Sequence, residues 1–515
     1  MGAIKSRKKL FTENFLIYGL GGIISKVIPL ILVPIITRLM PDSSYYGISD
    51  LANTVISFFS AIALLGMYDA MFRMFFEKDD LGYKKDICSS AFTFTLILSV
   101  FVSVLMCIFQ EPISRLFFSD PQYGYLVMIS AISVLVGTTN SIISAPTRMQ
   151  NKRGTYLIMN TVSPIISYAI SIPLLLNGYY LIALPVASAC SSVITEISFG
   201  IINHEWFSLK RTNWHYVWEM LKIALPLAPN FLIYWIFNSS DRVMIANLLS
   251  TSESGVYAVA AKFGHLSQLI YTAFAGGWQY FAFSVMKDKD NEAVVSKVFE
   301  VLLIASLTTT MMGTAIAKWG VKILFTEEYW SSYLCIPYLY LSPLLLMLFQ
   351  IGSNQFLVIK KTWPNIVILG VGAALNVALN FVLIPVIGIE GASLATFIGY
   401  FVSIVIMAIA LKKMKLMYIR AKTLIYSAMF LVGFGVMRIF DIAKWYVNLI
   451  VLVLFLVLTI LLYWKDYSKY LYFRKRHQKE NVSDDNSSGK NPDAQVVPSN
   501  PEKGKIESDT DDKKE

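Results

Sequence analysis

Apolar runs of about 20 residues recur along the whole chain, and no other feature restricts its fold as strongly. A helix of about that length crosses the hydrocarbon core of a bilayer. Only 15% of the 515 residues are charged, whereas a soluble domain carries about 25%. We therefore predict an all-α polytopic membrane protein with 14 transmembrane helices, near residues 12–37, 46–67, 87–109, 122–145, 155–176, 179–202, 217–239, 254–282, 293–316, 331–358, 364–387, 390–411, 421–439 and 444–464.

The loops between these runs carry an unequal share of basic residues. Loops on the side of the N-terminus hold 24 Lys and Arg, and the alternate loops hold 7. By the positive-inside rule, both termini face the cytoplasm of a bacterial cell, and the protein lies in its inner membrane. The net charge of +10 then reflects loops that face an anionic leaflet, so we expect the lipid bilayer as a partner and no nucleic acid.

A weak internal repeat appears when the chain is folded at about residue 210. Helix 1 ends in "ITRLMPDSSYYGISDLANTVISFF" and helix 7 in "SSDRVMIANLLSTSESGVYAVAAKFG". Each copy has a basic residue at a predicted helix end (Arg38, Arg242), a Ser-rich turn, and an aromatic residue beside a glycine (Gly47, Gly255). The second copy is about one turn longer between these landmarks. Such a repeat is typical of a duplicated transporter with two six-helix lobes in a pseudo-two-fold relation.

The repeat and the helix count together predict six regions. They are a basic N-terminus (1–11), an N-lobe of helices 1–6 (12–203), a cytoplasmic linker (204–216), a C-lobe of helices 7–12 (217–411), two extra helices 13 and 14 (412–464), and a disordered cytoplasmic tail (465–515). The tail is rich in Ser, Asp, Asn, Lys and Pro, and such a composition buries too little apolar surface to fold.

Two stretches resemble the polysaccharide-unit branch of the multidrug/oligosaccharidyl-lipid/polysaccharide exporter superfamily. They are "NFLIYGLGGIISKVIPLILVPIITRLMPDSSYYGI" and "LKIALPLAPNFLIYWIFNSSDRVMIANLLSTSESGVYAVAAK". The resemblance implies two lobes around a central cavity that opens alternately to each side. It also implies a flippase that moves undecaprenyl-diphosphate-linked oligosaccharides to the outer leaflet, with polysaccharide polymerase or assembly proteins as further partners.

Two lysines lie deep within predicted spans. Lys26 and Lys262 are about 16 Å and about 12 Å from the predicted outer ends of helices 1 and 8, at 1.5 Å per residue. Gly19, Gly22 and Pro29 share the face of Lys26 and would leave space beside it. Intramembrane charges are usually functional, so we expect both lysines to hold an anionic diphosphate in one cavity. The alternative is that each pairs with a carboxylate or extends to the interface.

Polar residues also form stripes on helices 7 and 8. His265 and Gln268 continue the face of Lys262, and Asn230 and Asn238 share one side of helix 7 with Tyr234 and Asp241. We expect these stripes to face the cavity and bind substrate, although polar residues also join membrane helices by hydrogen bonds.

Six further charged residues are candidates for gates or charge pairs: Arg38, Asp69, Arg73, Glu196, Asp241 and Arg242. Arg38, Asp241 and Arg242 mark predicted outer helix ends, where gate contacts and interfacial anchoring are equally plausible. Asp69 and Arg73 are one turn apart, a spacing at which they are expected to pair with each other. Glu196 is a candidate counter-ion or coupling-ion site, or a residue that reaches the membrane interface. Pro226 and Pro229 would bend helix 7.

No motif for chemistry is present. The sequence lacks a phosphate-binding loop, a nucleophile elbow, and a clustered His/Cys ligand set. We therefore predict no catalytic residue, no metal site and no cofactor, and a transport process with Na⁺ or H⁺ as candidate coupling ions. The alternatives are a lipid-linked peptidoglycan precursor flippase, a cation-coupled multidrug exporter, which would favour acidic cavity residues, and a membrane glycan polymerase or ligase, which would need a large outer loop.

Overall fold

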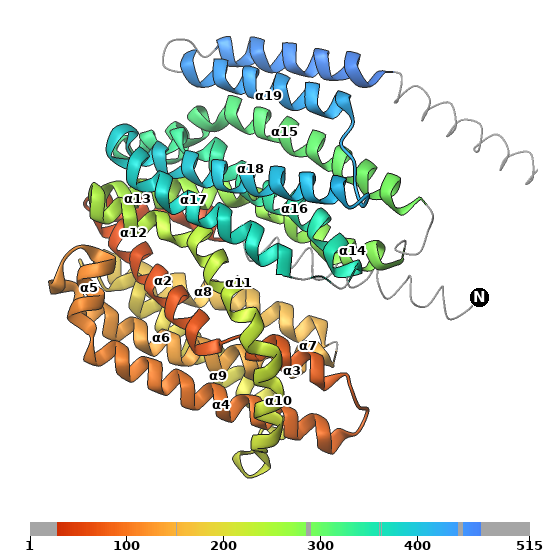
Figure 1. The fold of residues 1–515 in the computed structure, drawn as a ribbon. Coiled ribbons are helices and arrows are strands. Elements are labelled where there is room, and N and C mark those ends of the chain that lie inside the picture. The colour runs from red at the N-terminus through yellow and green to blue at the C-terminus, as the bar shows by residue number, and fades with distance from the viewer. Residues whose placement is uncertain are drawn as a thin grey trace, which may run out of the picture. The chain divides into compact units, whose positions relative to one another are not determined.

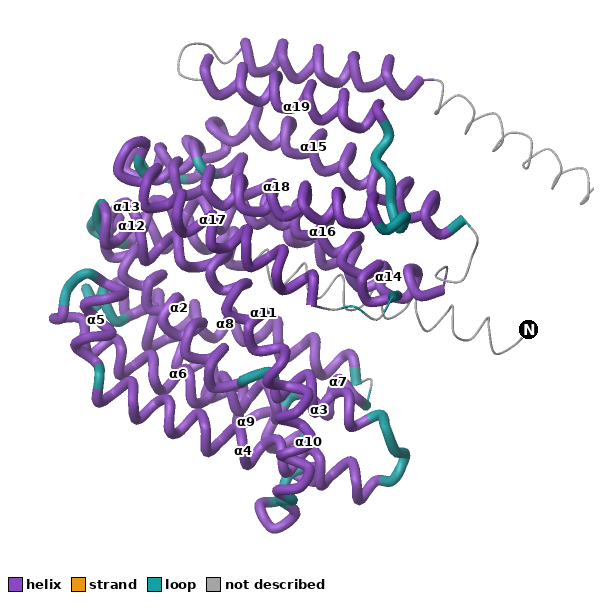
Figure 2. The backbone as a smooth tube through the Cα atoms, in the orientation of Figure 1, coloured by secondary structure: helices purple, strands orange, loops and turns teal. Residues whose placement is uncertain are grey.

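The computed structural model describes residues 28–150, 152–284, 290–359, 361, 363–440 and 446–464. These residues form helices and connecting turns, and none of them lies in a strand (Figure 2). The described residues as far as Phe455 belong to one compact unit, and those from Leu456 to Trp464 belong to a second. The predicted basic N-terminus, Lys26, and the predicted tail lie outside the described residues.

Twelve helices among the described residues are long and apolar enough to cross a membrane. They are Ser43–Leu64, Leu81–Ile108, Pro121–Met149, Gly154–Leu176, Ala183–Ile202, Trp214–Leu248, Asn291–Leu324, Ile336–Val358, Trp363–Ile387, Ile389–Lys413, Ala421–Ile439 and Tyr446–Trp464. Each overlaps one predicted span, so the all-α multi-pass membrane fold is confirmed.

The described parts of the other two predicted spans, helices 1 and 8, are also helical, but each continuous helix there is shorter than the twelve named above. Only the end of helix 1, Ile28–Leu39, lies within the described residues. Helix 8 consists of α13 (Thr251–Gly264) and α14 (Gln268–Ser284), separated by a single 3-10 turn, η6 (His265–Ser267). The turn interrupts the helix beside Lys262 and places His265 at the break.

The N-lobe is a bundle in which helices pack both on sequence neighbours and on helices further away in the chain (Figure 1). Its long helices are α2 (Ser43–Leu64), α4 (Leu81–Ile108), α6 (Gly124–Ile143), α8 (Arg153–Leu176) and α9 (Ala183–Ile202). Short helices and turns join them: α3 (Met67–Phe75), α5 (Gln110–Phe118), η1 (Pro121–Tyr123), α7 (Ala145–Met149), η2 (His204–Trp206) and η3 (Leu209–Arg211).

The C-lobe has a corresponding set of long helices. These are α15 (Asn291–Leu324), α16 (Ile336–Val358), α17 (Trp363–Ile387) and α18 (Ile389–Lys413), with the turn η7 (Glu327–Leu334) before α16. The additional helix 13, α19 (Ala421–Phe440), packs on α15. Two ion pairs also link it to the C-lobe: Arg420, just before α19, contacts Glu300 of α15 at 3.4 Å, and Arg438 contacts Glu390 of α18.

Helix 7 begins against the N-lobe and contacts both lobes further along its length. It runs through α10 (Trp214–Ala224), η4 (Leu225–Leu227), α11 (Ala228–Trp235), the π-helical turn η5 (Ile236–Ser240) and α12 (Asp241–Leu248). Its first part packs on α3 and α4 of the N-lobe, and its last part, α12, packs on α13 and α17 of the C-lobe and also on α5 of the N-lobe. The breaks include Pro226, which removes a backbone donor from the helix.

Residues at and just before the π-helical turn contact both lobes. Trp235 donates from Nε1 to Ser57 Oγ of α2 at 3.1 Å and packs on Phe58. Two residues later, Phe237 stacks on Tyr400 of α18 with ring centroids 4.0 Å apart. The sequence-based end of helix 7 at residue 239 is therefore wrong, since the helix continues to Leu248.

Candidate functional site

The two copies of the internal repeat contact each other at the predicted outer side. Helices α2 and α13 begin in the same way, with Asp42 and Ser250 as N-caps. Counted from these caps, Gly47 and Gly255 occupy the same position. A Cβ on Gly47 would lie 2.0 Å from the carbonyl oxygen of Thr251, and a Cβ on Gly255 would lie 2.0 Å from that of Ser43. The backbones of the two lobes therefore touch, and only glycine fits between them.

Polar contacts surround this glycine pair and also join the lobes. The hydroxyls of Ser43 and Ser252 are 2.5 Å apart. Arg38 donates to the carbonyl oxygens of Ile323 and Leu324, at 3.5 and 3.0 Å, at the end of α15.

Arg38 donates from the N-lobe to the C-lobe, and Asn247 of α12 donates from the C-lobe to the N-lobe, to the carbonyl oxygen of Leu116 in α5 at 2.8 Å. When the repeats are aligned from their caps, Arg38 falls beside Asn247. The sequence predicts Arg38 and Arg242 as equivalent positions of the repeat, each at a helix end. That equivalence is wrong, because Arg242 lies almost two turns before the end of its helix.

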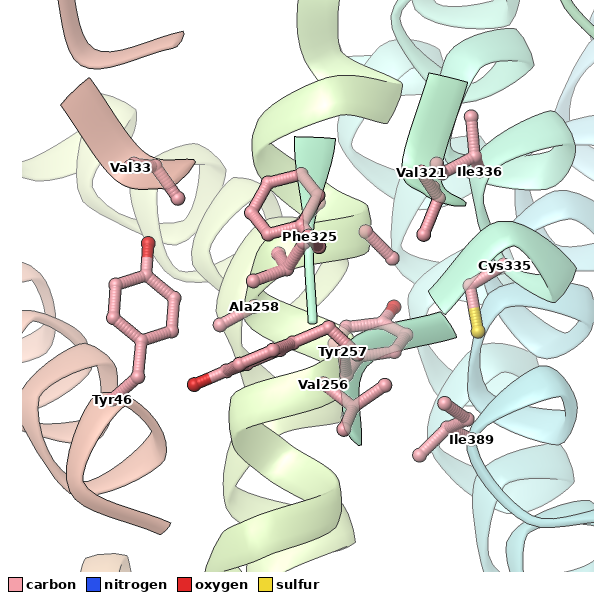
Figure 3. Close-up of a cluster of buried hydrophobic side chains, with 14 of the residues drawn as sticks. Val33, Tyr46, Val256, Tyr257, Ala258, Val321, Phe325, Cys335, Ile336 and Ile389 are labelled. Carbon is pink, nitrogen blue, oxygen red and sulfur yellow. The ribbon is translucent and has the colours of Figure 1, made fainter. Parts of the chain in front are cut away.

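A buried apolar cluster closes the same side of the molecule (Figure 3). Val33 and Tyr46 come from the N-lobe, and Tyr257, Phe325 and Ile389 come from the C-lobe. Figure 3 shows Val33 and Tyr46 on one side of the cluster and Tyr257, Phe325 and Ile389 on the other. The described residues thus hold the lobes together at the predicted outer side by backbone contact, hydrogen bonds and apolar packing.

A cavity lies between the lobes next to this closure. It has two adjoining parts, of about 700 and 690 Å³ with their open mouths included. Pro29 and Lys262 line both parts. The first part is lined mainly from the N-lobe, by Val33, Ile36, Tyr46, Asp50, Asn53, Pro164, Ser167, Tyr168, Leu184 and Ser188. The second is lined by Leu30, Arg242, Ala261, His265, Leu266 and Leu269.

Lys262 is the exposed cation of this cavity. Its side chain has no ion pair and no hydrogen bond within the described part of the chain. His265 lines the second part of the cavity. Lys26 lies outside the described residues. Pro29, about one turn further along the same predicted face of helix 1, lines the cavity.

Arg242 and Asp50 form a buried ion pair between the lobes. Arg242 Nε lies 2.6 Å from Asp50 Oδ2, and the side chains are 11% and 6% exposed. The Nε–H does not point along this line, so the contact is an ion pair without a hydrogen bond. Arg242 also donates from Nη1 to the carbonyl oxygen of Asn238. Asp50 was missed from the sequence, although a carboxylate within the predicted span 46–67 was a visible signal.

Asp241 faces away from this pair, into a network inside the C-lobe. Its Oδ1 accepts from Asn380 Nδ2 at 2.8 Å, and its Oδ2 accepts from Tyr257 at 2.6 Å and from Thr396 at 2.7 Å. Asp241 is 3% exposed. Its predicted place at an outer helix end is therefore wrong. The sequence did carry a signal for this network. Asn376 and Asn380 are four residues apart on α17 and therefore share one helix face.

The remaining predicted residues do not gather at the cavity. Asn230, Asn238 and Gln268 line neither of its two parts. The expected single stripe on helix 7 is wrong, because the π-helical turn changes the phase of the helix between Tyr234 and Asp241. Asn238 instead donates to the carbonyl oxygen of Tyr234 at 2.7 Å.

The charged candidates at the opposite end of the lobes are also apart from the cavity. Asp69 and Arg73 form no ion pair with each other within the described ranges, so their expected pairing is wrong. Arg148 lies near Asp69 and donates to the hydroxyl of Tyr68 at 2.8 Å. Glu196 accepts from Thr139 Oγ1 at 2.5 Å within the N-lobe. The described residues contain no group of three or more His, Cys, Asp or Glu placed to hold a metal ion.

Solved structures with the same fold are membrane transporters. A lipid II flippase MurJ in an inward closed conformation aligns with a TM-score of 0.67 and 15% identity, covering 88% of this chain and 99% of that one. A transporter of the same superfamily from Pyrococcus furiosus aligns with a TM-score of 0.58 and 12% identity, covering 79% and 96%. A MATE transporter from Vibrio cholerae aligns at 0.54 and 12%, covering 80% and 98%.

The family comparison is more specific than the fold. No curated protein matches significantly in sequence. Residues 35–334, however, match the family model described as polysaccharide biosynthesis protein. This segment contains both repeat copies from Arg38 onward and most of the cavity lining. The chain therefore belongs to the polysaccharide biosynthesis protein family.

Proposed function

We propose that this protein moves undecaprenyl-diphosphate-linked oligosaccharide repeat units from the cytoplasmic to the outer leaflet of the bacterial inner membrane, for the synthesis of a surface polysaccharide. The observation that carries the proposal is the Lys262 ammonium group, which faces the cavity between the lobes and has no counter-ion among the described residues. Membership of the family supplies the link to polysaccharides.

A cation without a partner suits a diphosphate. A lipid-linked diphosphate brings negative charge into a site of low dielectric constant, where an unpaired charge is costly. Hydrogen bonds between an ammonium group and phosphate oxygens offset that cost. Arg242 lines the same cavity, but its charge is balanced by Asp50 at 2.6 Å. Lys262 is therefore the described cation that a diphosphate would neutralise.

The contacts between the lobes suit alternating access. The contacts of Gly47, Gly255, Arg38 and Asn247 all lie at the predicted outer side. In the proposed cycle they separate, and helix 7 bends at its π-helical turn because Trp235 and Phe237 are held by different lobes. The substrate would enter from the cytoplasm, which requires the predicted cytoplasmic orientation of both termini.

Coupling to Na⁺ or H⁺ remains part of the proposal, and Asp241 is the carboxylate best placed for it. Three neutral side chains surround it, and the Oδ1 of Asn380 has no hydrogen-bond partner among the described residues. A carboxylate beside amide and hydroxyl oxygens provides the ligands that a hard cation prefers, and a proton could neutralise the same carboxylate. Asp241→Asn should abolish any dependence of transport on either ion gradient.

The test of the proposed function is a comparison of Lys262→Ala and Lys262→Arg in a strain that lacks the chromosomal copy. Lys262→Ala should reduce surface polysaccharide at least about tenfold, the effect of losing one charge-assisted contact of about 1.5–3 kcal/mol. Lys262→Arg should retain most of it, since it keeps the charge. Membrane levels of each variant are measured by immunoblot. Polysaccharide at the wild-type level in Lys262→Ala would refute the role of this cation.

The lipid-linked peptidoglycan precursor is the second candidate substrate, because a solved structure with the same fold is a lipid II flippase. That precursor also carries a diphosphate, so Lys262 suits it equally. Transport of lipid II and of a repeat-unit lipid by the purified protein in proteoliposomes would separate the two. Multidrug export is less well supported, since the exposed charge of the cavity is a cation and its carboxylate, Asp50, is paired.

A further inference from the structure

The two walls of the cavity differ in chemistry. The C-lobe wall contributes the charged or titratable groups Lys262, Arg242 and His265. The N-lobe wall contributes Asn53 from α2, Ser167 and Tyr168 from α8, and Ser188 from α9. We call these four residues the neutral wall.

The polar side-chain atoms of the neutral wall have no hydrogen-bond partner in the described part of the protein. None of the four side chains makes a hydrogen bond to another described residue, although all four lie in membrane-spanning helices. A polar side chain without a partner is unfavourable in a membrane helix unless it meets water or a ligand.

Serines nearby on the same two helices behave differently. Ser163 lies one turn before Ser167, and Ser191 lies about one turn after Ser188. The hydroxyls of Ser163 and Ser191 are 3.0 Å apart, and Ser191 also donates to the carbonyl oxygen of Ser163 at 2.6 Å. The α8–α9 interface thus satisfies the serines that it buries, while Ser167 and Ser188 face the cavity unsatisfied.

The charge of the neutral wall restricts its ligand. Asp50, the carboxylate in this part of the lining, is engaged by Arg242. Apart from Lys262, the described residues that line this part include no cation. An acidic group placed here would find Lys262 as the one cation of this described lining that is not already paired, and the proposed function assigns that cation to the diphosphate. Amide, hydroxyl and phenol groups beside an aromatic ring suit a ligand with many uncharged hydroxyl groups.

We propose that the neutral wall binds the uncharged sugars next to the diphosphate, with the diphosphate held by Lys262 at the junction of the two cavity parts. This inference rests on the proposed function and adds to it the class of the proximal sugar. The N-lobe selects the glycan through hydrogen bonds from Asn53, Ser167 and Ser188 and contact with the ring of Tyr168. The C-lobe binds the diphosphate that all such lipids share.

The experiment measures binding to the full-length protein in nanodiscs. The probes are undecaprenyl diphosphate, the same lipid carrying one glucose, and the same lipid carrying one glucuronic acid. The wild-type protein should bind the glucosyl lipid more tightly than the glucuronosyl lipid. Asn53→Ala and Ser188→Ala should each lower the affinity for the glucosyl lipid, relative to undecaprenyl diphosphate, about threefold to tenfold, as expected for one neutral hydrogen bond.

Ser191→Ala is the matched control, because it removes a hydroxyl from the same helix that the α8–α9 interface already uses. Thermal unfolding of each variant confirms that it is folded. The inference is overturned if Asn53→Ala and Ser188→Ala give the same affinity ratio as Ser191→Ala, or if the glucuronosyl lipid binds as tightly as the glucosyl lipid. Failure of Lys262→Ala to weaken binding of undecaprenyl diphosphate would instead refute the proposed function, and the two outcomes are therefore distinct.

Discussion

A methyl group at the contact between the lobes should prevent their closure at the predicted outer side. In Gly47→Ala the new Cβ would lie 2.0 Å from the carbonyl oxygen of Thr251 and 2.8 Å from the backbone nitrogen of Gly255. Ordinary van der Waals contact begins at 3.4 Å, so the first of these contacts is about 1.4 Å too short. Both neighbours are helix backbone, which cannot rotate away as a side chain would. Helices α2 and α13 must therefore separate.

The energetic cost follows from this overlap. Inserting a methyl group into a well-packed interface costs about 1–3 kcal/mol. The cost applies only to the closed arrangement, so the ratio of closed to open molecules should fall from about fivefold to more than 100-fold. We expect the upper part of this range, because Ser43 and Ser252 beside the glycine pair lose their contact when the helices separate.

The assay uses a disulfide as a reporter of closure. Cysteines replace Ser43 and Ser252, whose hydroxyls are 2.5 Å apart, in a background without the four native cysteines. Gly47→Ala should reduce the rate of disulfide formation tenfold or more. Gly137→Ala is the control, since a Cβ there meets nothing within 4 Å. If Gly47→Ala and Gly137→Ala crosslink at the same rate, the backbone contact does not govern closure and the reasoning is refuted.

Three further predictions concern the links between the lobes and helix 13. Asp50→Asn leaves the Arg242 charge buried without its partner, which costs about 3–5 kcal/mol; thermal unfolding in detergent should shift downward, and Asp50→Asn with Arg242→Gln should recover most of the loss. Phe237→Ala removes the buried ring of helix 7 that stacks on Tyr400, at a cost of about 3–5 kcal/mol. The unfolding temperature and the amount of surface polysaccharide should both fall, and an unchanged unfolding temperature would contradict this packing. Arg438→Met leaves Glu390 without its ion pair and should destabilise the protein more than Arg438→Met combined with Glu390→Gln does, as a double-mutant cycle in thermal unfolding would measure.

The membrane-spanning fold could be predicted from local composition. Each span must supply enough apolar length to cross the hydrocarbon core, and this requirement acts on every run separately. All twelve long helices found among the described residues accordingly overlap predicted spans. The exposed position of Lys262 in a cavity could also be predicted from the sequence, because an isolated cation within a span is costly unless it meets water or an anion.

The partners of the buried charges could not be predicted in this way. The polar segment that contains Asp241 and Arg242 has the composition of a helix end, so the predicted helix stops at residue 239. In the structure Asp50 neutralises Arg242, and Asn380 and Thr396 satisfy Asp241. These partners lie 139 to 192 residues away in the chain.

Tertiary structure also gave the internal repeat its physical meaning. From the chain alone, Gly47 and Gly255 are two similar positions in a faint duplication. The folded protein brings them together, so that each occupies the space that the other leaves. Whether a segment spans the membrane depends on the free energy of transferring that segment from water to lipid, so the spans can be predicted one segment at a time. The closure between the lobes, the Arg242–Asp50 pair and the neutral wall depend on which surfaces meet, and only the packing of distant helices decides that.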